Sequence, residues 1–128
     1  MPITVLLADG NESIRKAIQI LLAHASDIHI LAQATNFAQT VEFTSKLKPQ
    51  VILLDLHMPD ERLMKAEEVK SKLMGSGLLA ISLWNDEETR ALAKNMGAMK
   101  LLDNARLGTD LIPAIRNCVK TDSYFQTD

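Results

Sequence analysis

Five short apolar runs alternate with amphipathic stretches along the whole chain, and this alternation limits the fold more than any other feature of the sequence. Apolar runs rich in β-branched residues are typical of strands buried on both faces of a sheet. The stretches between them repeat apolar residues at helical spacing, as Ile14, Ile18 and Leu21 do after the first run. Strict alternation of strands and helices predicts a doubly wound α/β fold, with a five-stranded parallel sheet and five helices on both of its faces.

Turn and cap residues place the boundaries of these elements. The predicted strands are Ile3–Ala8, Ile28–Ala32, Val51–Leu54, Leu78–Leu83 and Met99–Leu102. Five helices are predicted between and after these strands. Asn11 caps the first, which ends near Ala25, and Asn36 caps the second, which ends at Leu47. The third runs from about Glu61 to Met74, the fourth from a cap at Asn85 or Asp86 to Met96, followed by Gly97, and the last has apolar residues at helical spacing from Leu111 to Val119.

Pro113 conflicts with the pattern of the last helix, because a proline inside a helix removes one hydrogen bond and costs ~3 kcal/mol. We therefore expect this helix to begin near Thr109, with Pro113 in about its first turn, and a kink if it begins earlier. No repeat or low-complexity linker divides the chain. Residues 1–120 are predicted to form one domain, and residues 121–128 a free polar tail or the start of a linker to an output domain.

The composition excludes several classes of protein. Of 128 residues, 47% are hydrophobic and 23% charged, which is usual for a globular domain, and a net charge of −2 gives no reason for nucleic-acid binding by this domain. A single cysteine, Cys118, rules out an internal disulfide. No apolar run approaches the ~20 residues of a membrane span, and the first residues lack the basic start of a signal peptide. We expect a soluble, cytoplasmic protein without a membrane partner.

Polar side chains follow the predicted strands where each strand ends. They are Asp9, Asp55, Ser82 and the pair Asp103-Asn104. Ligands of open parallel sheets bind at the carboxyl ends of the strands, so we expect these residues to share one crevice. Two carboxylates in one crevice indicate a cation site or a shifted pKa, although each Asp alone is as well explained as a turn former.

Four segments resemble response regulator receiver domains, from residue 3 to about residue 120. Val51–Pro59, with Asp55 before Met-Pro, is similar to the phosphoacceptor motif of that family. Val5–Arg15 resembles its first strand and acidic turn, Ala80–Glu88 its fourth strand with a switch hydroxyl, and Met96–Ala98 its turn into the fifth strand. The resemblance implies a sheet with strand order 2-1-3-4-5 and a role in two-component phosphorelay signal transduction.

The resemblance also implies a role for each matching residue. Asp55 would be the phosphoacceptor and Ser82 the hydroxyl that holds a phosphoryl oxygen. Asp9, Asp55 and the backbone carbonyl of His57 would hold magnesium. The domain would not be an enzyme beyond self-catalysed phosphoryl transfer. Its partner would be a sensor histidine kinase, with a homodimer through the fourth helix, fifth strand and fifth helix.

Two positions depart from the pattern of the family. Gly10 stands where the second acid would be, so magnesium binding is expected to be weak or absent. Asn104 stands where a lysine would be, and an amide cannot replace its ion pair with the phosphoryl group. Lys100 lies nearby but should point elsewhere, and Leu101 takes the place of the aromatic switch residue.

Two functional states of a receiver therefore stay open. In one, Asp55 is phosphorylated slowly or with a weakly bound metal. In the other, which the two missing side chains favour slightly, a pseudo-receiver keeps the fold as a docking module that works without phosphate. A small flavodoxin-like cofactor binder is a further alternative, which the lack of a glycine-rich loop after the first strand disfavours.

Other residues have both a functional and a structural interpretation. His57 is expected to face solvent and to tune access of water to Asp55 rather than to act as a base. Trp84 is expected either to cover the pocket or meet a partner, or to pack on the last two helices. Glu12 is expected to stabilise a helix N-terminus rather than replace the missing acid, and Cys118 to be an inert buried thiol. The first helix resembles receivers joined to helix-turn-helix domains, so nucleic acid and transcription regulation are expected only through an output domain.

Overall fold

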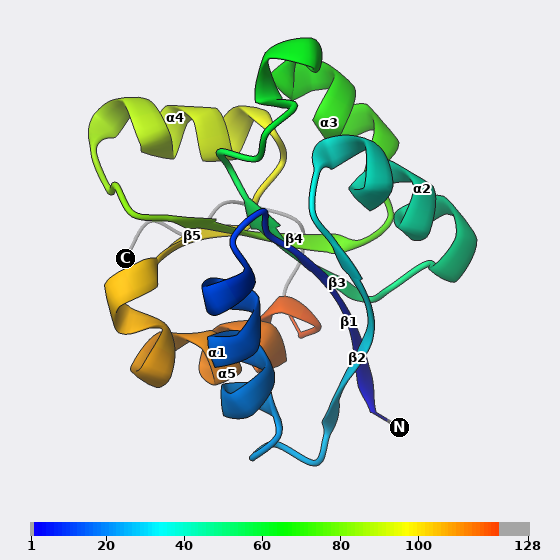
Figure 1. Cartoon of the computed structure of the whole chain (residues 1–128), viewed down its shortest axis with the longest axis vertical. Coiled ribbons are helices and arrows are strands. Elements are labelled where there is room, and N and C mark those ends of the chain that lie inside the picture. The colour runs from blue at the N-terminus through cyan, green and yellow to red at the C-terminus, as the bar shows by residue number, and fades with distance from the viewer. Residues whose placement is uncertain (1, 121–128) are drawn as a thin grey trace.

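The computed structural model describes residues 2–120, which form a three-layer α/β sandwich around one parallel sheet (Figure 1). The strands are β1 (Ile3–Ala8), β2 (Ile28–Ala34), β3 (Val51–Asp55), β4 (Gly77–Ser82) and β5 (Lys100–Asp103). The helices are α1 (Glu12–Leu22), α2 (Phe37–Leu47), α3 (Ala66–Lys72), α4 (Glu87–Asn95) and α5 (Leu107–Cys118), with 3-10 turns η1 (Glu61–Leu63) and η2 (Asn104–Arg106). The polar tail predicted for residues 121–128 lies outside the described residues.

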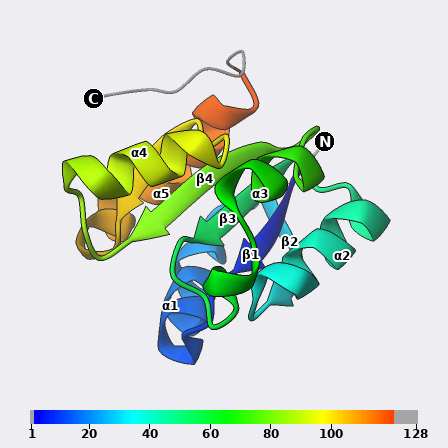
Figure 2. The same cartoon turned by 90° about the horizontal axis from the view of Figure 1, so that it is seen from above.

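The five strands lie in the order β2-β1-β3-β4-β5, and every pairing is parallel, which confirms the predicted fold. Alternate residues of the central strands point to opposite faces, so the sheet has two cores. Val5 and Leu53 belong to the core beneath α1 and α5, whereas Leu6 and Leu54 belong to the core beneath α2, α3 and α4. Figure 2 shows the same division of the helices seen from above. None of the helices in residues 2–120 is long and apolar enough to cross a bilayer.

Side-chain caps fix three of the helix starts where the sequence predicts them. Asn11 accepts a hydrogen bond from the backbone N–H of Ile14 at 3.0 Å, and Asn36 accepts one from Gln39 at 2.7 Å. Of the two residues proposed to cap α4, Asp86 is the cap. Such caps pair amide groups that the first turn of a helix leaves free.

Two helices begin elsewhere than the sequence predicts. The stretch from Glu61 is not one continuous helix, because η1 ends at Leu63, Lys65 is extended, and α3 begins at Ala66. The start of α5 near Thr109 is also wrong, since the helix begins at Leu107 and contains Pro113 in its interior. Burial of Leu107 and Leu111 against the sheet stabilises this earlier start.

Candidate functional site

A hollow of about 470 Å³ opens at the carboxyl ends of β1, β3, β4 and β5. Its lining includes four of the residues that the strand ends predict, namely Asp9, Asp55, Ser82 and Asn104, together with the loop residues Gly10, Asn11, Ile14, His57, Pro59, Leu83 and Trp84. Asp103, the fifth strand-end residue, is instead turned to η2, where its carboxylate accepts the N–H of Ala105 at 2.9 Å.

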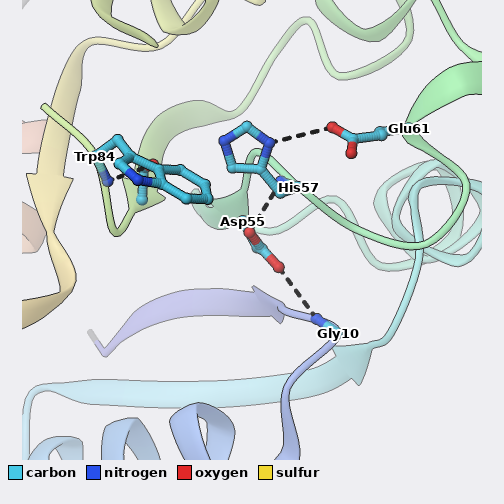
Figure 3. A network of polar contacts seen from close by, with 6 residues as sticks. Gly10, Asp55, His57, Glu61 and Trp84 are labelled. Carbon is cyan, nitrogen blue, oxygen red and sulfur yellow. Dashed lines mark hydrogen bonds and ion pairs between the residues drawn. The ribbon is translucent and has the colours of Figure 1, made fainter. Parts of the chain in front are cut away.

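Asp55 is the last residue of β3, and backbone amides hold both oxygens of its half-buried carboxylate (Figure 3). The N–H of His57 donates to Oδ1 at 2.9 Å, and the N–H of Gly10 donates to Oδ2 at 3.4 Å. These donors come from the loops after β3 and β1. The carboxylate is therefore oriented by neutral groups and stays accessible from the hollow.

Asp9 is buried beside Asp55, and its charge is costly there. Burial, followed by the nearby Asp55 carboxylate, raises the pKa of Asp9 to about 6, although a hydrogen bond from the Asn11 N–H lowers it. That bond measures 2.8 Å, and the Arg15 guanidinium donates to the Asp9 backbone carbonyl at 2.7 Å. Two acids that repel each other in one hollow form a site that favours a proton or a cation.

Ser82 ends β4 with its side chain buried, and its hydroxyl oxygen accepts the N–H of Trp84 at 3.0 Å. This bond uses an oxygen lone pair, so the hydroxyl proton stays available to donate. The hollow thus has a neutral hydroxyl donor in addition to its two carboxyl groups.

The two departures from the receiver pattern lie in this hollow. A Cβ atom at Gly10 would stand 3.2 Å from Cδ of Pro59, so the loop after β3 fills the space beside the missing acid. At the lysine position, Oδ1 of Asn104 is buried without a hydrogen-bond partner. Neither lysine nor arginine occurs among the described residues that line the hollow. As predicted, Lys100 points elsewhere, into a groove with Leu101 and Pro113.

The donor set of the hollow suits a hard cation. Magnesium prefers oxygen ligands and commonly takes one or two carboxylates with several waters. Asp9 and Asp55 supply two mutually repelling carboxyl groups. No group of three or more His, Cys, Asp or Glu side chains placed to hold a metal occurs within residues 2–120. The residues therefore fit magnesium through two carboxyl groups, those of Asp9 and Asp55, rather than three.

Two loop residues near the site, Asp60 and Glu61, were not predicted to make the contacts that the structure shows. Asp60 accepts the N–H groups of Phe37 and Ala38, at 2.8 and 3.0 Å, and so caps α2 from the loop after β3. Glu61 was assigned to a helix, but its carboxylate lies 3.2 Å from Nδ1 of His57. No spacing rule predicts this contact, because His57 lies in a turn before the predicted start of the helix at Glu61.

The remaining candidates have structural surroundings. Glu12 forms an exposed ion pair with Lys16 at 3.2 Å in the first turn of α1. Cys118 is buried, which raises the pKa of its thiol to about 11. Trp84 is 55% exposed and lies against the His57 ring. The expectation that Glu12 and Cys118 are not site residues agrees with these contacts.

Comparison with known sequences identifies relatives along most of the chain. Residues 5–116 match the family described as the response regulator receiver domain. The nitrate/nitrite response regulator protein NarL of Escherichia coli K12 is 31% identical over 115 residues, which cover 89% of this chain and 53% of that protein. The response regulator VraR of Staphylococcus saprophyticus is 28% identical over 100% of this chain and 62% of its own length. The chain thus spans little more than half of these relatives.

Comparison with solved structures agrees on the fold. The signal receiver domain of a NarL response regulator from Mycobacterium tuberculosis superposes with a TM-score of 0.83 at 22% identity, covering 94% of this chain and 98% of that one. The response regulator domain of Thermotoga maritima CheB gives 0.81 at 22% identity, covering 95% and 99%. At this identity the similarity concerns the fold alone.

Proposed function

We propose, since this chain belongs to the response regulator receiver domain family, that it carries a signal in a two-component system by accepting a phosphoryl group on Asp55. The donor is a phosphohistidine of a sensor histidine kinase in the cytoplasm. The observation that carries the proposal is the placement of the Asp55 carboxylate, which two backbone amides orient within a hollow shared with Asp9 and Ser82.

The transfer needs little chemistry from the protein beyond position and charge. A carboxylate oxygen of Asp55 forms a bond to phosphorus while the bond from phosphorus to the donor nitrogen breaks, and that nitrogen takes up a proton. Ser82 donates its hydroxyl proton to a phosphoryl oxygen. Asp9, Asp55 and the backbone carbonyl of His57 would hold magnesium, which when bound neutralises charge on the transferring oxygens.

Asn104 makes the transfer slow in this proposal. A phosphoryl group brings negative charge into a hollow that already has two carboxyl groups and no lysine or arginine among its described lining residues. A neutral amide compensates less of that charge than an ammonium group. The chain therefore depends on its donor, and on the weakly held cation, more strongly than a receiver with a lysine does.

The output surface is proposed on α4, β5 and α5, where a second copy of the chain would dock. The groove there contains two basic residues, Lys100 and Arg106, and two acidic ones, Asp103 and Asp110. A twofold axis places such a mixed surface against itself, so opposite charges can meet in both directions. Contact with nucleic acid is proposed only for an attached output domain.

Incubation with acetyl phosphate and magnesium tests the proposal. Intact mass spectrometry should detect one phosphoryl group that base and hydroxylamine remove in the wild type, and none in Asp55→Asn. Asp103→Asn, which replaces an acid outside the hollow, should still be labelled. A beryllofluoride adduct that requires Asp55 would agree. If neither appears, the domain works as a docking module without phosphate.

A further inference from the structure

The loop after β3 and the loop after β4 touch each other through two rings beside Asp55. The imidazole of His57 and the indole of Trp84 have centroids 5.1 Å apart and planes at 85° (Figure 3). Rings of this kind favour such an edge-to-face arrangement. We refer to this contact as the His57–Trp84 bridge. It connects the segment that follows the phosphoacceptor to the segment that follows Ser82.

Glu61 holds the imidazole from its other side. Its Oε2 lies 3.2 Å from Nδ1 of His57, and in Figure 3 the imidazole lies between the Glu61 carboxylate and the indole. Rotation of the ring would break the contact with Glu61 and disturb the one with Trp84. The carboxylate therefore fixes the orientation in which His57 meets the indole.

The bridge lies on the solvent side of the Asp55 hollow. Both residues line the hollow, yet Trp84 is 55% exposed, whereas Ser82, which lines the same hollow, is 2% exposed. In Figure 3 the bridge and Gly10 lie on opposite sides of the Asp55 carboxylate. A molecule that approaches Asp55 from the bridge side must therefore pass the two rings.

We infer that Glu61 is a positioning residue, which holds His57, and through His57 the indole of Trp84, in an arrangement that narrows access to Asp55. The consequence rests on the proposed function. A narrowed entrance slows arrival of a phosphodonor. It also slows hydrolysis, in which water adds to phosphorus, the bond from phosphorus to the Asp55 oxygen breaks, and inorganic phosphate leaves with the carboxylate restored.

Fluorescence quenching tests the positioning role without any phosphate, because Trp84 is the only tryptophan of the chain. Loss of an edge-to-face contact should favour the open arrangement by about 2- to 10-fold, so acrylamide should quench Trp84 more strongly in Glu61→Ala and in His57→Ala. The double variant should match His57→Ala, since Glu61 acts through the imidazole. Glu61→Gln, whose amide oxygen still accepts from Nδ1–H, should restore much of the protection.

Glu67→Ala is the matched control. It also removes an exposed carboxylate, but from the next helix, whereas the carboxylate that contacts His57 is that of Glu61. Its quenching should equal that of the wild type. Unchanged quenching in Glu61→Ala would overturn the inference, and so would an additive effect of Glu61→Ala in the His57→Ala background.

The rates of phosphoryl gain and loss test the consequence for access. With acetyl phosphate as donor, Glu61→Ala and Trp84→Ala should both raise the two rates by about 2- to 10-fold, while Glu67→Ala leaves them unchanged. Altered quenching with unaltered rates would reject the role in access. If neither the wild type nor any variant takes up a phosphoryl group, the proposed function fails. The quenching measurements still decide whether Glu61 positions Trp84.

Discussion

The two ends of the sheet are built in opposite ways. At the amino end, neutral groups pair with one another: Thr4 and Gln50 exchange bonds of 3.0 and 2.9 Å, the N–H of Gly77 donates to Gln50, and the Ser76 hydroxyl donates to Pro49. At the carboxyl end, two acids repel each other around a hollow, and Oδ1 of Asn104 has no partner. Satisfied contacts stabilise the amino end, whereas the carboxyl end keeps unbalanced charge available for a ligand.

Asn104→Lys should produce the largest effect of the predicted substitutions, because its positive charge would offset the negative charge at the carboxyl end of the sheet. An added charged donor at the reacting group is worth about 100-fold in rate, or ~2.7 kcal/mol, so acyl-phosphate formation from acetyl phosphate should rise by about that factor. The initial rate of phosphoryl incorporation measures the effect. Asn95→Lys adds the same charge at the end of α4, outside the hollow, and should change nothing. Equal rates in both variants would refute this view of Asn104.

Gly77→Ala should have the next largest effect. It should lower the free energy of unfolding, because a methyl group at this position would overlap Sγ of Cys118. Overpacking of this kind costs about 2 kcal/mol in the free energy of unfolding, measured by urea denaturation. Adding Cys118→Ala should recover part of the loss. Gly108→Ala is the control, since nothing lies within 4 Å of the added methyl. A Gly77→Ala protein as stable as that control would contradict the tight packing.

Ionisation of Asp9 at neutral pH costs ~3 kcal/mol of folding free energy, since its pKa is raised from 3.8 to about 6 and each unit is worth ~1.4 kcal/mol. Asp9→Asn removes this cost but still buries a polar amide, so it should stabilise the chain by about 2 kcal/mol. Between about pH 4 and 6 the folded chain holds a proton that the unfolded chain has lost, so the free energy of unfolding of the wild type falls as pH rises through this window. The advantage of the variant should therefore shrink toward about pH 4.

Urea denaturation with a metal chelator at several pH values checks this. A variant that is less stable than the wild type at neutral pH, or whose advantage is equal at both ends of the window, would show that the carboxyl end is not electrostatically strained.

Gln50→Ala should have the smallest effect of the four. It removes the acceptor of the Thr4 N–H and costs about 1 kcal/mol of unfolding free energy, the usual value of one hydrogen bond. Gln19→Ala, on the exposed side of α1, is the control and should stay within about 0.5 kcal/mol of the wild type. A loss equal to that of Gly77→Ala would mean that polar pairing and packing stabilise the amino end to the same extent.

Periodicity predicted the architecture because each strand and helix presents a regular apolar pattern to one of the two cores. The errors fall where a local rule competes with packing. Pro113 predicted a late start for α5, but burial of Leu107 and Leu111 outweighs the hydrogen bond that proline cannot make. The strand β2 runs to Ala34, beyond the predicted Ala32, because pairing with β1 extends it past its apolar run.

The candidate site, too, was predictable in part. Strand ends predicted that Asp9, Asp55, Ser82 and Asn104 would meet, since parallel strands bring their carboxyl ends to one edge. The contact of His57 with Trp84 was not predictable from spacing, because 27 positions separate two loops whose approach depends on the turns that leave β3 and β4. Loop geometry, rather than strand order, decides which loop side chains surround Asp55.

The carboxylate of Asp60 joins two segments that are far apart in the sequence. By accepting the first amides of α2, at Phe37 and Ala38, it makes the start of that helix depend on the loop after β3. Any rearrangement of the loop that withdraws Asp60 leaves these two amides without their acceptor. Hydrogen exchange at the amides of Phe37 and Ala38 would then become faster, so exchange at the start of α2 would report a rearrangement of the loop that follows Asp55.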